Sequence, residues 1–328
     1  MRKLRFLSVA LFLLVAIIIC VGFGGTKIPF VEVMKSIFLR KSGWKDIIWN
    51  IRLPRVIMSV IAGAGLATVG SVFQGLLRNP LIDPYLLGVS SGASFGTVLS
   101  LFLVDAFGLH LLHRMSLLSF SFSILAAFMT LVLSRRNGIT PITELILSGV
   151  LVSILFSSAT ILVMMILRKN ITHAYVWLFG TLSGITWKEI PLPLLSIIGF
   201  TLICLGLAQQ LNAISLGENQ AKISGVNVEA VKILIYTLGS FATATIVSVC
   251  GVIGFVGLIT PHMARRLFGS DHKVLTLTSS LMGGILLCIC DTFARSVIRP
   301  SEIPIGVITA FIGAPVMFVL MKRSDSSG

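Results

Sequence analysis

The sequence predicts an all-α protein that crosses a membrane about ten times. Only 12% of its residues are charged, about half the share that is usual in soluble domains. Nine long stretches carry no charge at all, and most match the roughly 20 apolar residues that a membrane helix needs. They lack the alternation of barrel strands, so helices must satisfy the backbone hydrogen bonds within lipid. The spans nearly fill the 328 residues, which indicates a single membrane domain over 1–328.

The uncharged runs, in chain order, are 6–26, 56–77, 85–104, 115–134, 145–167, 190–208, 233–260, 274–290 and 303–321. The first run follows basic residues and exceeds the usual core of a signal peptide, so we expect a retained first span.

The seventh run is too long for one crossing, since it stays uncharged until Arg265. Glycines and Pro261 within it favour a break, which we expect near 250–254. The split gives ten spans, although the boundaries within 233–264 stay open. Both termini are basic, and the positive-inside rule then predicts that both are cytoplasmic. This orientation requires an even number of crossings, as ten spans provide.

Three connecting segments are informative. Segments 27–55 and 169–189 each contain two tryptophans, which suit the interface between membrane and water. The longest internal polar stretch, 209–232, contains Gly217 and Gly225, and this spacing predicts two short helices separated by turns.

Small residues within the third run predict a close helix crossing. Gly88, Gly92 and Gly96 recur every four residues, and this spacing lets a second helix backbone approach closely. Tolerated glycine, which is common in membrane helices, is the alternative.

Composition excludes several classes of function. The net charge of +14 comes from residues at span ends and in loops, and no basic stretch carries interleaved aromatics for nucleic acid. The five cysteines lie in or beside apolar runs without ligand spacing, so we expect neither a disulfide nor a metal site. Asp291 and Arg295 are spaced for an i,i+4 ion pair. Intramembrane ionisable residues are otherwise scarce, which argues against proton coupling and against an enzyme.

The chain lacks a Gly-Lys dipeptide and therefore a P-loop for ATP. We expect no cofactor on this chain. If ATP drives transport, a separate subunit must bind ATP and Mg²⁺ and hydrolyse the nucleotide.

Three blocks carry a resemblance to a known family. They are residues 51–96, beginning IRLPRVIMSV, residues 251–273, beginning GVIGFVGLITPHMARR, and residues 291–323, beginning DTFARSVIRPSEIPIG. Together they resemble the permeases of ABC importers for iron–siderophore complexes and cobalamin. The resemblance implies a type II importer architecture with inverted repeats. It also implies a dimer with a second permease subunit, two ATP-binding cassette subunits, and an external substrate-binding protein.

The resemblance also implies roles for particular residues. Arg52, Arg55 and Arg295 match arginines that dock the binding protein, although lipid headgroups, or Asp291 for Arg295, are alternative partners.

Segment 209–230 matches the coupling helices that contact the ATPase. The candidate contacts there are Leu216, Gly217, Glu218, Ala221, Gly225 and Val226, and an ordinary solvated loop is the alternative. Thr140, Pro141 and Thr143 match a cytoplasmic gate, unless Pro141 merely begins a helix. Segment 173–187 matches a short outer helix beside the pathway.

The sequence therefore predicts the permease of an ATP-driven importer in the cytoplasmic membrane. An iron(III)–siderophore is the expected cargo, while haem and cobalamin stay open because related permeases use the same fold. An ion-coupled secondary transporter is the more distant alternative. The choice between a homodimer and a heterodimer also stays open.

Overall fold

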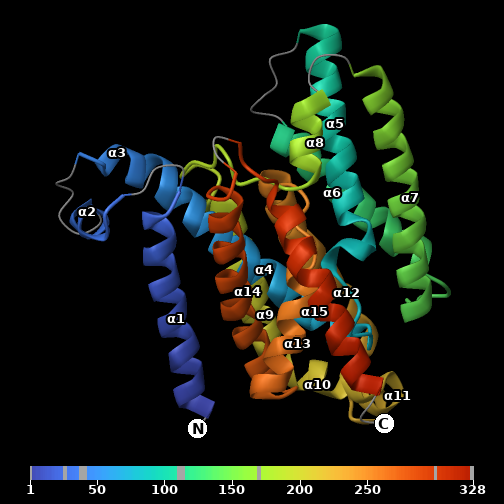
Figure 1. Ribbon diagram of the computed structural model, residues 1–328. Helices are drawn as coiled ribbons and strands as arrows, with labels where there is room; N and C mark the ends of the chain where they lie inside the picture. The colour runs from blue at the N-terminus through green and yellow to red at the C-terminus, as the bar shows by residue number, and fades with distance from the viewer. Residues whose placement is uncertain are drawn as a thin grey trace.

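The computed structural model describes residues 2–24, 28–36, 43–108, 115–167, 171–298 and 301–325. Within these ranges the regular structure is helical, apart from one isolated antiparallel bridge between Arg136 and Ile139. The helices form an elongated bundle (Figure 1). We call the end with α10 (Ala208–Leu216) and α11 (Glu218–Ile223) the lower end. The upper end carries α2 (Phe30–Met34) and α8 (Ile171–Leu178).

Ten helices correspond in order to the ten predicted spans. They are α1 (Arg2–Gly22), α4 (Leu53–Leu76), α5 (Val89–Phe107), α6 (Met115–Ser134), α7 (Ile142–Ile166), α9 (Pro191–Gly206), α12 (Val228–Cys250), α13 (Val256–Phe268), α14 (His272–Ala294) and α15 (Ile305–Asp325). Among the described residues, seven helical segments are individually long and apolar enough to cross a membrane. Helix α9 joins α10 at a bend of 67° as an eighth. Helix α15 contains a shorter apolar segment, Ile305–Val319, and α13 is only 13 residues long, with two arginines in its last turn.

The predicted break in the long apolar run is confirmed, because α12 ends at Cys250 and α13 begins at Val256. Gly251 has a φ of +69°, and a Cβ there would overlap the carbonyl oxygen of Trp177. Other chain segments satisfy the exposed backbone groups. Thr181 N–H donates to Cys250 O at 2.9 Å, and Ile253 N–H donates to the Tyr85 hydroxyl at 3.2 Å. Such partners are what non-helical backbone requires within a membrane protein.

Helix α4 forms the centre of the bundle. Its N-terminus is extended by α3 (Lys45–Ile47) and a π-helical turn, η2 (Ile48–Arg52). It packs tightly against α14, where a Cβ on Gly63 would overlap the Gly283 carbonyl oxygen, and the reverse also holds. Small residues at such a crossing permit close contact of two backbones. By contrast, α1 and α7 expose most of their apolar side chains.

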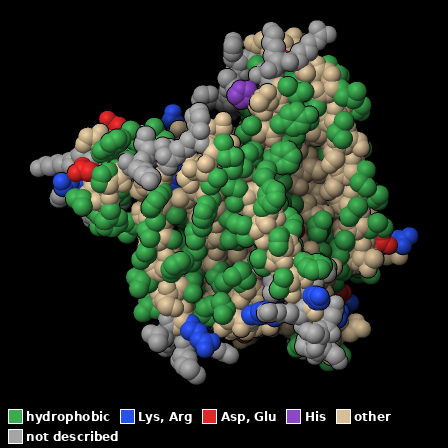
Figure 2. All heavy atoms as spheres, viewed as in Figure 1, with side chains coloured by type: hydrophobic (Ala, Val, Ile, Leu, Met, Phe, Trp, Pro, Cys, Tyr) green, Lys and Arg blue, Asp and Glu red, His purple; other side chains and the backbone are tan. Residues whose placement is uncertain are grey.

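The surface agrees with a membrane-embedded bundle. Figure 2 shows apolar side chains over the middle of the visible face, with Lys and Arg at the lower end and the margins. Helix α1 begins and α15 ends at the same, lower end (Figure 1). This arrangement agrees with an even number of crossings.

Candidate transport pathway and its two ends

A half-open groove runs beside α7. Its volume is about 670 Å³, and its walls come from α5, α7, α13 and the short helix η3 (Pro84–Leu87). Apolar side chains line most of it, and four serines add hydroxyl groups: Ser90, Ser153, Ser157 and Ser158. This lining can accommodate a bulky ligand and offer it hydrogen bonds without a fixed positive charge.

One carboxyl group, Asp83, lines the same groove. It caps η3 by accepting a hydrogen bond of 3.0 Å from the Tyr85 backbone N–H. Burial raises the pKa of Asp83 to about 6, although this hydrogen bond opposes the shift. Sequence reasoning missed Asp83, because an Asp before Pro is usually only a turn signal.

A second cavity extends the groove toward the upper end. It measures about 510 Å³ and shares Ser157 and Ile161 with the first cavity. Tyr175 and Leu178 of α8 close its other side. The sequence predicted a short outer helix in 173–187, and α8 lies at the start of that segment. Helices α5 and α7 thus line both cavities, and α7 supplies the two residues that they share.

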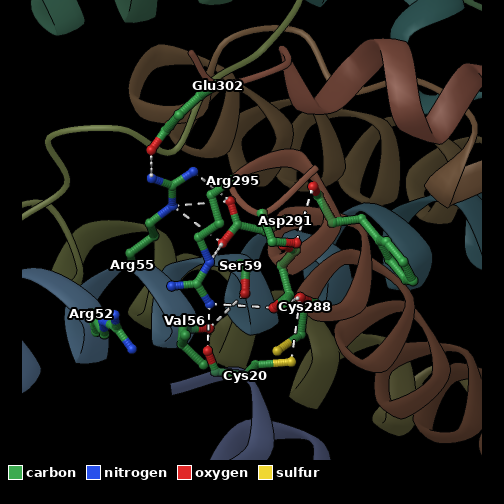
Figure 3. A network of polar contacts seen from close by, with 12 residues as sticks. Cys20, Arg52, Arg55, Val56, Ser59, Cys288, Asp291, Arg295 and Glu302 are labelled. Atoms are coloured by element: carbon green, nitrogen blue, oxygen red, sulfur yellow. Dashed lines mark hydrogen bonds and ion pairs between the residues drawn. The ribbon is translucent and has the colours of Figure 1, made fainter. Parts of the chain in front are cut away.

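At the upper end, buried arginines surround one carboxylate (Figure 3). The Arg55 guanidinium donates to Asp291 with Nε at 3.0 Å and Nη2 at 2.9 Å, and its Nη1 donates to Glu302 at 2.9 Å. Arg295 lies 3.4 Å from the other Asp291 oxygen. Its Nη2 donates to the Cys20 carbonyl oxygen. This network joins α1, α4 and α14 with the segment before α15.

The structure thus brings the three predicted docking arginines to one end, but it buries them. Arg52 donates to the carbonyl oxygens of Val21 and Gly22 at 2.9 and 2.8 Å. The exposed fractions of Arg52, Arg55 and Arg295 are only 5%, 9% and 6%. The predicted ion pair between Asp291 and Arg295 is confirmed. Sequence reasoning missed Glu302, since no local spacing links it to Arg55.

At the lower end, the predicted gate residues lie where α7 begins. Pro141 is the N-cap residue of α7, so it does precede a helix start. Thr140 is buried, with 1% of its surface exposed, whereas Thr143 faces outward. The Thr140 carbonyl oxygen accepts a hydrogen bond of 2.7 Å from Lys232 Nζ.

The predicted coupling segment contains the two short helices that the sequence indicated, α10 and α11. Gly217 and Gly225, the turn residues after these helices, have positive φ values of 151° and 82°. Leu216 and Ile223 are strongly exposed, with exposed fractions of 74% and 87%. Ile223 is not among the contacts that the sequence indicated.

The remaining selected residues differ in exposure. Glu218 and Val226 are half-buried. Ala221 is an exception among the six candidates, because it is fully buried in the core and cannot face a partner. Its burial seats α11 against the bundle.

The three glycines of the third span occupy two environments. A Cβ at Gly92 or Gly96 would overlap a carbonyl oxygen of α6, Phe122 or Leu118 respectively. Gly88 instead precedes α5, with a φ of +89°. It forms the turn from η3 into α5, because this left-handed conformation favours glycine. The span begins at Val89 rather than at residue 85.

Lys232 is a further functional candidate that sequence reasoning missed. It directly precedes the uncharged run 233–260, but it lies inside α12, more than one turn after the N-cap residue Asn227. An ionisable residue at the start of a long apolar run, with Glu229 three positions before it, was the available signal.

A many-spanning bundle with a groove along one helix, and with distinct elements at its two ends, defines a membrane transport permease. Comparison with known proteins gives the family: residues 12–323 match the FecCD transport family, and the chain belongs to it. It is the permease subunit of a binding-protein-dependent ABC importer of the FecCD type.

Relatives cover nearly the whole chain. The Fe(3+)-citrate import system permease protein YfmE of Bacillus subtilis is 35% identical, over 97% of this chain and 95% of that protein. The cobalamin import system permease protein BtuC of Halobacterium salinarum is 38% identical, over 85% of this chain and 74% of that protein. A solved structure of a metal-chelate type ABC transporter, in an inward-facing conformation, has a TM-score of 0.84 and 31% identity. The match covers 98% of this chain and 99% of that one.

Proposed function

We propose that this permease carries iron(III)–siderophore complexes through the groove beside α7. The observation that carries the proposal is the groove lining, which is largely apolar with four serine hydroxyls. A chelated metal presents the outer surface of its organic ligand, so it needs volume and hydrogen bonds rather than metal ligands from the protein. The similarity to a permease for Fe(3+)-citrate supports an iron chelate. Similarity to a cobalamin permease keeps cobalamin as an alternative cargo. Haem is the other alternative cargo.

In this proposal the lower end is cytoplasmic, and both termini lie there. Two ATP-hydrolysing subunits dock on α10 and α11, and a second permease subunit completes the pathway. The exposed Leu216 and Ile223 supply apolar contact area for the ATPase. Thr140, Pro141 and Thr143 form the gate at the start of α7.

The transport experiment uses vesicles that contain the permease, its ATPase and its binding protein. Labelled iron–siderophore, haem and cobalamin are supplied in parallel, with ATP or a non-hydrolysable analogue. We expect uptake of iron–siderophore that requires ATP hydrolysis. Uptake driven by an ion gradient alone would refute the mechanism, and faster uptake of haem or cobalamin would refute the cargo.

A matched pair of variants tests the pathway. Ser157→Phe fills the part of the groove that both cavities share, so uptake should fall. Ser121→Phe, at an exposed site on α6 that does not line the groove, makes the same substitution elsewhere and serves as the control. Equal uptake by both variants would exclude the groove as the pathway.

We also propose that the upper end receives the binding protein through Arg52, Arg55 and Arg295. Charge reversal of Arg52 or Arg55 should weaken association and flatten its dependence on salt. Because these side chains are buried, the melting temperature of each variant must be measured beside its affinity. Unchanged affinity in a folded variant would contradict the docking role.

A further inference from the structure

A single buried ammonium group connects three elements at the lower end. Lys232 of α12 is 2% exposed. Its Nζ lies 2.7 Å from the Thr140 carbonyl oxygen, 2.8 Å from Glu218 Oε1 and 3.6 Å from Glu229 Oε2. An ammonium group has three N–H donors, and here it faces three acceptors. One acceptor belongs to its own helix, the second belongs to the preceding helix α11, and the third, Thr140, is 92 positions away in the sequence.

The two acceptors outside α12 lie in the elements that the proposed function assigns to coupling and gating. Glu218 is the first residue of α11. Thr140 directly precedes Pro141, the N-cap residue of α7. From this start, α7 continues upward and contributes Ser153 and Ser157 to the groove. Lys232 therefore lies between the docking element and the helix that forms the groove wall.

The surroundings leave these elements room to move relative to each other. A cavity of about 480 Å³ is lined by residues of these elements, among them Thr140, Pro141, Glu218, Gly225 and Lys232. Buried charge pairs contribute little net stability compared with apolar packing, and their attested value lies in fixing one specific arrangement. A flexible lysine stem with a charged tip can keep both contacts while the cavity changes shape.

We propose that Lys232 is a positioning residue that transmits movement of α11 to α7, so that ATPase closure reshapes the groove. The inference rests on the proposed function. It adds the link between coupling at α11 and gating at α7. A movement of Glu218 is passed to Thr140 through the ammonium group, and the movement of Thr140 shifts the first turn of α7. Such a two-state link is one way in which a local contact controls a distant site.

The test uses the complete transporter in vesicles and measures both uptake and ATP hydrolysis. Lys232→Met keeps the stem and removes the charge. We expect assembly and hydrolysis to persist while uptake per ATP falls by about tenfold, the range of a typical coupling free energy. Lys232→Arg should restore much of the ratio, because a guanidinium can reach the same acceptors. Lys273→Met, at an exposed site at the start of α14, is the control.

A second readout follows the groove itself. Ser157→Cys places a thiol in the groove, and the five native cysteines are buried, so background labelling should be low. In the parent chain, ATP should change the rate of maleimide labelling. With Lys232→Met added, we expect that change to vanish although hydrolysis continues. A merely structural lysine would instead lower hydrolysis and uptake together.

An unchanged ratio of uptake to hydrolysis in Lys232→Met would overturn the inference, as would a proportional loss of both. If Lys232→Met does not fold, Glu218→Ala removes the α11 arm alone and leaves Lys232 paired with Glu229. Normal coupling in that variant would equally overturn the link. Failure of the proposed function is distinct, since the unsubstituted chain would then show no ATP-dependent uptake at all.

Discussion

Removal of the Asp291 carboxylate should destabilise the bundle strongly. Its side chain is 1% exposed and pairs with two guanidinium groups, those of Arg55 and Arg295. The substitution Asp291→Ala leaves both cations buried, and only Arg55 retains an anionic partner, Glu302. Breaking a buried pair in this way costs about 3–5 kcal/mol. The loss should be greatest where α4 and α14 meet α1, because the network joins these helices.

The measurement is the free energy of unfolding in detergent, from a denaturant titration followed by circular dichroism. Glu302→Gln is the matched control, since the Glu302 side chain is 41% exposed and a pair of that exposure contributes about 1 kcal/mol or less. A double-mutant cycle with Arg55→Met isolates the pair, because loss of Arg55 should cost less once Asp291 is absent. A loss below about 1 kcal/mol for Asp291→Ala would refute the reasoning, since it would mean that the network is hydrated.

Three further predictions concern other parts of the bundle. Gly70→Ala should destabilise the chain by about 1–3 kcal/mol or prevent folding, because the new Cβ would overlap the Gly257 carbonyl oxygen. The control Gly199→Ala should leave stability unchanged, because nothing lies within 4 Å of its new Cβ. The pKa of Asp83 is raised to about 6 in the folded protein, against about 4 in the unfolded chain. The protonated carboxyl should therefore stabilise the folded state fully below about pH 4, and this stabilisation should be lost as the pH rises through about 6. Melting temperatures at several pH values would check this, and Asp83→Asn should remove the dependence. Ile223→Asp should weaken binding of the ATPase subunit in a pull-down titration. The exposed control is Lys273→Asp, and an equal effect of the two variants would argue against an apolar contact at Ile223.

The sequence predicted much of the fold because membrane helices are encoded locally. Long uncharged runs set the spans, and the glycines of 251–257 mark the break between α12 and α13, whereas Pro261, which was also expected to favour a break, lies inside α13. The two short helices of the coupling segment followed from Gly217 and Gly225 in the same way. The ion pair between Asp291 and Arg295 was also predictable, since i,i+4 residues face each other on a helix.

The site was predictable only in part, because burial depends on the packing of distant segments. The basic residues Arg52 and Arg55 stand at the edge of an apolar run and are typical of an exposed interface, yet the fold encloses both. Ala221 belongs to a polar stretch, yet it points into the core. Sequence spacing alone does not reveal which side of a short helix will be covered.

The amino-acid sequence by itself determined that this chain is a helical membrane permease, the order of its spans and the break in the long apolar run, and which family it resembles. Only the tertiary structure decided which polar groups meet. Arg55 and Asp291 are 236 positions apart, and Lys232 and Thr140 are 92 apart. The physical reason is that hydropathy and backbone preference act over a few residues, whereas the register of one helix against another depends on close packing of their surfaces.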